Sequence, residues 1–297
     1  MPIIAIHIGI PRTGTTTIQK NILNLSKNHI AIQKNPYGSS GNSKKANKQT
    51  KADNIDICKL LDSLEGREVI FREAIMLPVA KLAVDPNRSH FKKALLSAAT
   101  QLVRKTNKQI IISSERLCDT SASLRGDSRH DPTGDKCFGI IPLASTLKDA
   151  NLTPLIITCL RSPIPYLRSK WIRTAFQRKF LSLRQITPNE YIQKQVKLET
   201  NYPNTSVLTH AMHAQFIKLL QKYTFVKAFG FQELLESNDV FSLMGLQGEE
   251  KYAFQDFPRE NKLPFSKEQE QKIEIEITES LKQYGFYDRI MKAQIYE

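Results

Sequence analysis

Short apolar runs alternate with longer amphipathic stretches along most of this 297-residue chain. The runs are rich in β-branched residues and are bounded by polar or turn-forming positions, which is typical of buried strands. They predict four strands: residues 3–8, 109–115, 153–161 and 225–231. Strands that alternate with helices indicate a parallel sheet with right-handed crossovers. We therefore expect an α/β fold in three layers, with a central, mainly parallel sheet flanked by helices.

Helices are expected between these strands. Apolar residues at helical spacing mark four of them: residues 15–25, 55–64, 89–103 and 206–223. Gly66 is expected to end the second. Two more helices are predicted to begin at capping boxes, formed by Thr187 with Glu190 and by Ser266 with Gln269.

The length allows two domains, although α/β folds of about 250–300 residues are often single. We expect one α/β domain over residues 1–297, with inserted loops near residues 35–53 and 117–136. The first segment is polar and rich in Lys, and the second is rich in Asp, Ser, Arg and Gly. Loops of this length inside a compact fold are typically lids or binding loops, or are disordered.

No apolar run approaches the roughly 18 residues that a membrane-spanning helix needs. The first apolar run lacks the cationic leader of an export signal. The four cysteines have no metal-like spacing, which favours reduced thiols and argues against structural zinc. We therefore expect a cytoplasmic protein with no membrane span.

The chain is basic, with 43 Lys and Arg against 29 Asp and Glu and a formal charge of +14. This excess suits an anionic ligand such as a nucleotide, a phosphorylated or sulfated substrate, or a nucleic acid. Part of it lies in residues 38–51, a stretch typical of a solvated loop, so charge alone does not require such a ligand. No recognition module with interleaved aromatics is evident, and no nucleic-acid partner is expected.

A glycine-bearing turn follows the first expected strand. Gly9 and Gly14 have the spacing of a P-loop, whose backbone N–H groups and helix N-terminus bind phosphate oxygens. Thr15 stands where a Walker loop has its lysine, and Arg12 supplies a cation nearby. No expected strand ends in the Asp that helps an NTPase to hold magnesium. The turn therefore indicates a site for phosphate or sulfate oxygens that requires no metal, although an ordinary strand-to-helix turn has similar glycines.

A second basic position ends the third expected strand. Arg161 stands there, where a guanidinium can bind a phosphate through two parallel hydrogen bonds. Ser169 follows in the first turns of the next helix and can add a hydroxyl to the same phosphate. Taken alone, an arginine at a strand end is often only a surface residue.

Together these two elements resemble the PAPS-dependent sulfotransferases, a family with a P-loop-like fold that uses 3′-phosphoadenosine-5′-phosphosulfate (PAPS). The resemblance implies that the 5′-phosphosulfate is wrapped by a loop of seven residues: Pro11, Arg12, Thr13, Gly14, Thr15, Thr16 and Thr17. It also implies that Arg161 and Ser169 bind the 3′-phosphate. The basic residue of the loop is often Lys in this family, and Arg12 keeps its charge. The wider order of motifs is similar to bacterial sulfotransferases that act on glycans or natural products.

The implied reaction moves a sulfuryl group from PAPS to a hydroxyl or amine of a glycan or small natural product, and leaves adenosine 3′,5′-bisphosphate (PAP). Such a transfer needs in-line geometry, stabilisation of developing charge and a base for the acceptor proton. Arg12 and the loop amides are expected to supply the charge stabilisation. Glu115 is the expected base, because it ends a strand predicted to neighbour the first one. A capping or arginine-pairing role for Glu115 is the alternative.

Other polar residues are open to two interpretations. A histidine is the alternative to Glu115 as the base, and the candidates are His7, His210 and His213. His7 lies inside the first strand and fits a core or supporting role, whereas His210 and His213 lie on one expected helix and either pack or face a cleft. Ser113 and Ser114 either satisfy the end of their strand or bind a ligand. The polar residues 259–261 are a weaker candidate for closing over the nucleotide.

Two other functions remain as alternatives. The P-loop spacing also fits a small-molecule kinase that uses ATP with magnesium, and the charge alone fits a nucleic-acid-binding protein. The residues leave open the identity of the acceptor and the choice between O- and N-sulfation. They give no oligomeric state.

Overall fold

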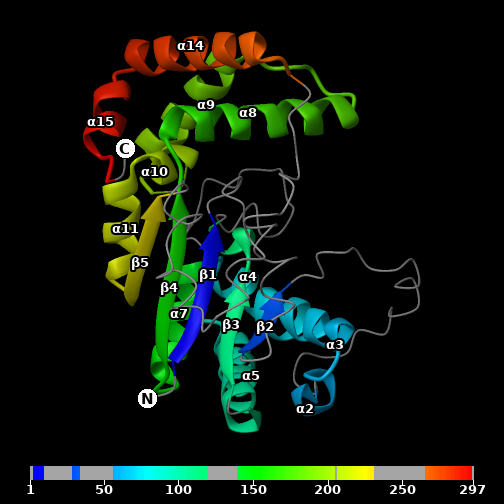
Figure 1. The fold of residues 1–297 in the computed structure, drawn as a ribbon. Coiled ribbons are helices and arrows are strands. Elements are labelled where there is room, and N and C mark those ends of the chain that lie inside the picture. The colour runs from blue at the N-terminus through cyan, green and yellow to red at the C-terminus, as the bar shows by residue number, and fades with distance from the viewer. Residues whose placement is uncertain are drawn as a thin grey trace, which may run out of the picture.

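A single parallel sheet organises the described part of the chain (Figure 1). The computed structural model describes residues 3–9, 29–33, 56–106, 108–118, 139–204, 206–230 and 265–295. Five strands pair in parallel in the order β2-β3-β1-β4-β5. In chain order these are β1 (Ile3–Gly9), β2 (His29–Gln33), β3 (Gln109–Ser113), β4 (Thr153–Leu160) and β5 (Phe225–Gly230). The expected α/β fold with a parallel sheet and flanking helices is confirmed.

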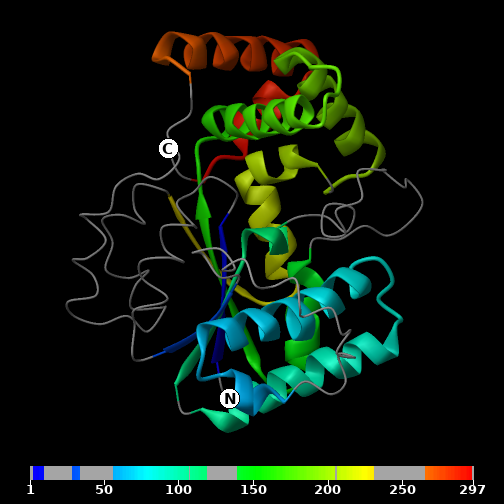
Figure 2. The same ribbon diagram turned by 90° about the vertical axis from the view of Figure 1, so that its right-hand side faces the viewer.

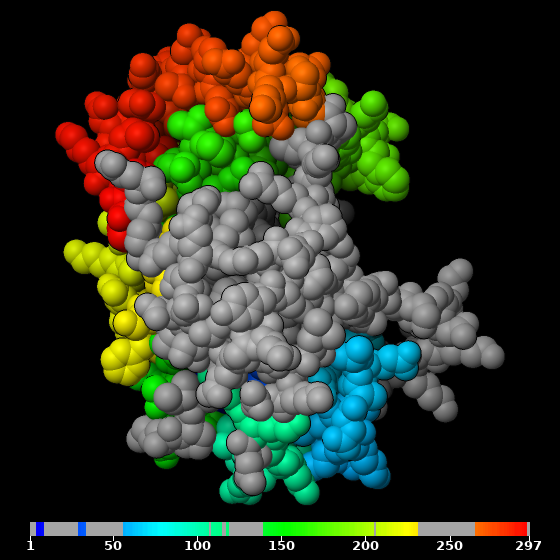
Figure 3. Space-filling view, viewed as in Figure 1, coloured from blue at the N-terminus to red at the C-terminus, as the bar shows by residue number. Residues whose placement is uncertain are grey.

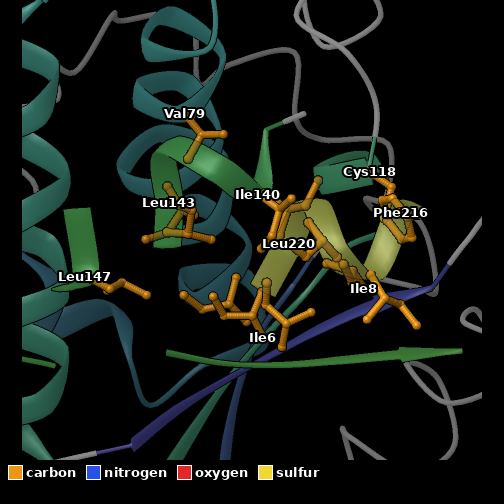
Figure 4. Packing of buried hydrophobic residues seen from close by; sticks show 14 of the residues in the cluster. Ile6, Ile8, Val79, Cys118, Ile140, Leu143, Leu147, Phe216 and Leu220 are labelled. Carbon is orange, nitrogen blue, oxygen red and sulfur yellow. The ribbon is translucent and has the colours of Figure 1, made fainter. Parts of the chain in front are cut away.

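Helices cover one face of this sheet, as the turned view shows (Figure 2). They are α2 (Ile57–Leu60), α3 (Leu64–Val69), α4 (Leu77–Leu82), α5 (Ser89–Lys105), α7 (Ile140–Asp149) and α11 (His213–Gln221). On the central strand, Ile6 and Ile8 face Leu143 of α7 and Leu220 of α11 (Figure 4). Burying an isoleucine side chain contributes about 1.5–3 kcal/mol. Because side chains alternate along a strand, His7 lies on the opposite face of the sheet, where it is also buried.

A second group of helices lies beyond the carboxyl end of β4 (Figure 1). It contains α8 (Pro163–Phe180), α9 (Pro188–Asn201), α10 (Val207–Ala211), α14 (Lys267–Gln283) and α15 (Tyr287–Lys292). Arg168 of α8 binds α14 through ion pairs of 2.8 Å to both Glu270 and Glu274. Both predicted capping boxes are present, at the starts of α9 and α14. None of the helices in the described ranges is both long enough and apolar enough to cross a bilayer.

The structure differs from the sequence-based expectation at several elements. The expected helix over 55–64 is divided, because α2 ends at Leu60 and α3 begins at Leu64. Gly66 does not end a helix but lies inside α3, which continues through a π-helix (Ile70–Met76) into α4. The expected helix over residues 206–223 is broken at Met212, where ψ is 77°, into α10 and α11. Strand β2 was not predicted, because its five residues lie in a stretch dominated by polar side chains. The expected helix over 15–25 and the inserted loop 35–53 lie outside the described residues, as does most of 117–136.

Gly66 allows α2 and α3 to approach each other closely. A Cβ atom built there would lie 2.1 Å from the main-chain oxygen of Leu60, which is well inside van der Waals contact. The prediction is that Gly66→Ala lowers the free energy of unfolding by about 1–3 kcal/mol, because one of the two backbones must move. Urea denaturation measures this, with Lys93→Ala on the exposed face of α5 as the control. An unchanged midpoint for Gly66→Ala would contradict the close approach.

Candidate functional site

The carboxyl ends of β1, β3 and β4 lie side by side, at the edge of the sheet where parallel α/β folds bind their ligands. His7 of β1 is level with Ser113 of β3, and Gly9 is level with Cys159 of β4. The chain leaving β1 goes to β2 on one side of the sheet, whereas the chain leaving β4 goes to β5 on the other. The ends of β1 and β4 therefore form the position where the strand order reverses, which is the usual ligand position in such folds.

Arg161 directly follows β4, two residues beyond the level of Gly9. Its main-chain carbonyl accepts a hydrogen bond of 3.0 Å from Nε2 of His213, the first residue of α11. Burial lowers the pKa of His213, so the ring is neutral and its proton is on Nε2, facing the carbonyl. This bond fixes the backbone of Arg161 and leaves the residue partly exposed. The structure thus places Arg161 at the expected edge of the sheet.

Ser169 lies on the second turn of α8 and is buried. A ligand that reaches its hydroxyl must therefore be enclosed by protein. The same helix is held by Tyr166, whose hydroxyl lies 2.9 Å from Nδ1 of His210 in α10. Burial and, to a smaller extent, the charge of Lys170 together lower the pKa of His210 to about 3, so His210 is neutral. Arg161 and Ser169 therefore belong to one strand-to-helix junction whose two sides are each held by a neutral histidine.

His7 ties the end of β1 to the end of β3. Its Nδ1 lies 2.8 Å from Oγ of Ser113, and its main-chain carbonyl accepts a 3.0 Å hydrogen bond from the amide of Ser114. Burial lowers the pKa of His7 to about 4, so the ring is neutral near pH 7. In the described part of the chain its Nε2 has no hydrogen-bond partner. The core or supporting role expected for His7 agrees with this geometry.

Glu115 follows that turn and begins a short 3₁₀ helix, Glu115–Cys118. Strand β3 therefore ends at Ser113, two residues earlier than expected, although it does neighbour β1 as expected. Because β3 and β4 lie on either side of β1 and neighbouring strands are about 4.8 Å apart, the strands that lead to Glu115 and to Arg161 are roughly 10 Å apart across the sheet. The side chain of Glu115 lies outside the described atoms.

The rest of the predicted site falls on residues that the structure does not describe. These are the seven residues of the loop, Pro11, Arg12, Thr13, Gly14, Thr15, Thr16 and Thr17, and the later candidates Arg259, Glu260 and Asn261. Gly9, the last residue of β1, marks where the loop begins. Within the described ranges, no three His, Cys, Asp or Glu side chains gather as a metal site would require.

Two supporting contacts were not predicted from the sequence. The bond between Tyr166 and His210 depends on a contact between α8 and α10, which are distant in the sequence. Of the two interpretations for His213, packing and a position in a cleft, the structure agrees with packing, since the ring is buried against the carbonyl of Arg161. The indole of Trp171 in α8 donates a 3.1 Å hydrogen bond to the carbonyl of Ile186. The only hint of these contacts in the sequence is that His210 and His213 lie three residues apart on an expected helix.

The buried neutral histidines make stability depend on pH. An unfolded histidine binds a proton below about pH 6.5, whereas folded His7 does so only near pH 4 and His210 only near pH 3. The stability they contribute is therefore fully present above pH 6.5 and is lost as pH falls below it, at about 1.4 kcal/mol per pH unit for each histidine. Urea unfolding between pH 7.5 and 5 measures this slope. His7→Asn, which keeps one polar atom near Ser113, should make the slope shallower, and an equal slope would contradict the burial of a neutral His7.

Comparison with known proteins gives no family. No protein-family model matches the sequence, and no curated protein does. One solved structure is from a characterisation of the PezAT chromosomal toxin-antitoxin system of the human pathogen Streptococcus pneumoniae. The alignment covers 95% of this chain and 88% of that one, with 14% identity and a TM-score of 0.29. A likeness this weak carries no argument about function, so the inference of function depends on the site itself.

Proposed function

We propose that this protein is a sulfotransferase that moves a sulfuryl group from PAPS to a hydroxyl or amine of a glycan or small natural product. The observation that carries the proposal is the register of β1 and β4. Gly9, where the P-loop-like sequence begins, is level with Cys159, and Arg161 follows two residues later on the adjacent strand. The two motifs that resemble the family are about 150 residues apart in sequence, yet they leave the sheet from neighbouring strands at its ligand-binding edge.

The hydrogen-bond donors of the two motifs suit a nucleotide that carries phosphate groups at both the 3′ and the 5′ position of its ribose. In the proposal, Arg12 and the amides of the loop from Pro11 to Thr17 bind the 5′-phosphosulfate. Arg161 and Ser169 bind the 3′-phosphate, the first through paired charged hydrogen bonds and the second through its hydroxyl. The hydrogen bond from His213 to the main chain of Arg161 supports this role. An arginine whose backbone is already held loses less conformational entropy when its guanidinium binds a ligand.

The proposed chemistry is a single in-line displacement. The acceptor oxygen or nitrogen forms a bond to sulfur while the bond between sulfur and the 5′-phosphate oxygen breaks, and PAP leaves with the electron pair. A base takes the acceptor proton, and Arg12 stabilises the charge that develops on the transferred and leaving oxygens. The demands on the protein are positioning and electrostatics.

Glu115 is the base in this proposal. Its main chain follows β3 on one side of β1, and Arg161 follows β4 on the other, so that β1 lies between them in the strand order. The histidines considered as alternatives support this choice by their burial. His7, His210 and His213 are each at most 4% exposed, and each already bonds a protein group.

The 3′-phosphate contact can be tested by removing Arg161. Arg161→Ala is predicted to weaken binding of PAP at least tenfold, because hydrogen bonds to a charged phosphate are each worth about 1.5–3 kcal/mol. Binding of adenosine 5′-monophosphate, which lacks the 3′-phosphate, should change much less. Calorimetric titration measures both, with Arg104→Ala at the exposed end of α5 as the matched control. Equal losses for the two nucleotides would rule out this role for Arg161.

The base can be tested by removing only its charge. Glu115→Gln is predicted to lower kcat by about 10²–10⁴-fold and to leave PAP affinity within a few fold, because a general base acts on the acceptor proton and not on the nucleotide. Release of PAP from PAPS, followed with a panel of alcohols, amines and glycans, measures the turnover. Glu65→Gln on the exposed side of α3 is the control. Full activity in Glu115→Gln would assign the base elsewhere.

A further inference from the structure

Exposed apolar side chains gather at the C-terminal end of α8 and in the turn after it. Phe176, Phe180, Leu181 and Leu183 are 44%, 88%, 62% and 48% exposed. Single exposed apolar residues are common on protein surfaces, whereas several of them close together mark an interaction site. We call this segment, residues 173–184, the α8 tip. It stands at the upper right edge of the molecule, where the green helix ends (Figure 3).

The α8 tip is an ordered turn. The amide of Leu181 donates to the carbonyl of Gln177 at 3.0 Å, and the amide of Leu183 donates to the carbonyl of Arg178 at 2.8 Å. Ser182 adopts a left-handed conformation with φ of 54°, which turns the chain between the two leucines. The apolar side chains are therefore held outward by a defined backbone, so their exposure is a fixed feature of the folded protein.

The surroundings of these side chains are strongly basic. The segment 163–189 contains no Asp or Glu and has six cations: Arg168, Lys170, Arg173, Arg178, Lys179 and Arg184. Arg168 pairs with two glutamates of α14, and Arg184 pairs with Glu190. Arg178 donates a hydrogen bond to the carbonyl of Arg184 and lies near Glu190. Among the described residues, no carboxylate lies within ion-pair distance of Arg173 or Lys179. Arg173 and Lys179 are thus available to an anionic partner at the same place as the exposed apolar groups.

We propose that the α8 tip docks on an anionic phospholipid surface. Phenylalanine and leucine side chains enter the boundary between headgroups and acyl chains, and each adjacent cation adds attraction to anionic headgroups. A glycan would use the cations and leave the leucines in water. Single-stranded nucleic acid would stack on the phenylalanines, but it gains little from Leu181 and Leu183. A lipid interface is the one partner whose chemistry uses both sets of side chains.

The proposed docking leaves the ligand edge of the sheet free. Arg161 stands at the N-terminal end of α8, and the 18-residue helix places its tip about 25 Å away. Docking is therefore independent of the proposed sulfotransferase activity, and either can fail without the other. If both hold, the active site works a short distance above a membrane.

Vesicle sedimentation tests this inference with the full chain. The protein should sediment with vesicles of phosphatidylcholine that contain a quarter phosphatidylglycerol, and at least tenfold less with phosphatidylcholine alone. Raising salt from about 0.1 to 0.5 M should weaken binding, since it screens the exposed cations. The double variant Phe180→Ser and Leu181→Ser, and separately Arg173→Gln with Lys179→Gln, should each lose at least tenfold in partitioning.

A matched control distinguishes binding through the α8 tip from nonspecific binding through any exposed apolar side chain. Phe225→Ser removes a phenylalanine that is 72% exposed at the start of β5, at the opposite end of the sheet, and should bind vesicles like the wild type. Circular dichroism and thermal melting show that each variant is folded. Equal binding to both vesicle types, or tip variants that bind like the wild type, would overturn the proposal. So would light scattering that shows a dimer lost in the tip variants, because the partner would then be a second copy of this chain.

Discussion

The central strand β1 is hydrogen-bonded in parallel to β3 on one side and β4 on the other, and the site depends on this pairing. Parallel pairing brings the carboxyl ends of all three strands to one edge. The register then decides which residues meet there: Gly9 opposite Cys159, and His7 opposite Ser113. A shift of one residue would turn Ile6 and Ile8 from the helix-covered core to the opposite face. Core packing therefore maintains the geometry of the ligand edge.

Neutral buried histidines hold the segments that leave this edge. His7 bonds the end of β3 through a side chain and a main-chain contact, and His213 bonds the carbonyl of Arg161. His210 bonds Tyr166 of α8. None of these bonds needs a charged ring, and burial keeps each ring neutral by lowering its pKa. Neutral rings therefore hold these segments without adding a further charge beside Arg161.

The sequence predicted the fold class because the strands on which it depends are long apolar runs with clear turn signals. It also predicted that Arg161 lies at a strand end, because this charged residue directly follows the mostly apolar run of residues 153–160. It missed β2, whose sequence HIAIQ is short and ends in polar residues. It also joined α10 to α11 across Met212, next to which the amide of Ala214 bonds the carbonyl of Ala293, a residue distant in the sequence. The bonds of His210 and His213 connect distant segments, and local patterns carry no record of such contacts.

Calorimetric titration of the wild-type protein with PAP and with ATP, each with and without magnesium, is the sharpest test of the proposed donor site. PAP is expected to bind tightly and with an affinity that magnesium does not change, and ATP is expected to bind more weakly. PAP is favoured because the proposed site binds a 5′-phosphate and a 3′-phosphate, and ATP has no 3′-phosphate. Magnesium is not needed because the loop has Thr15 in place of the Walker lysine. Tighter binding of ATP that requires magnesium would contradict the account and would favour a small-molecule kinase.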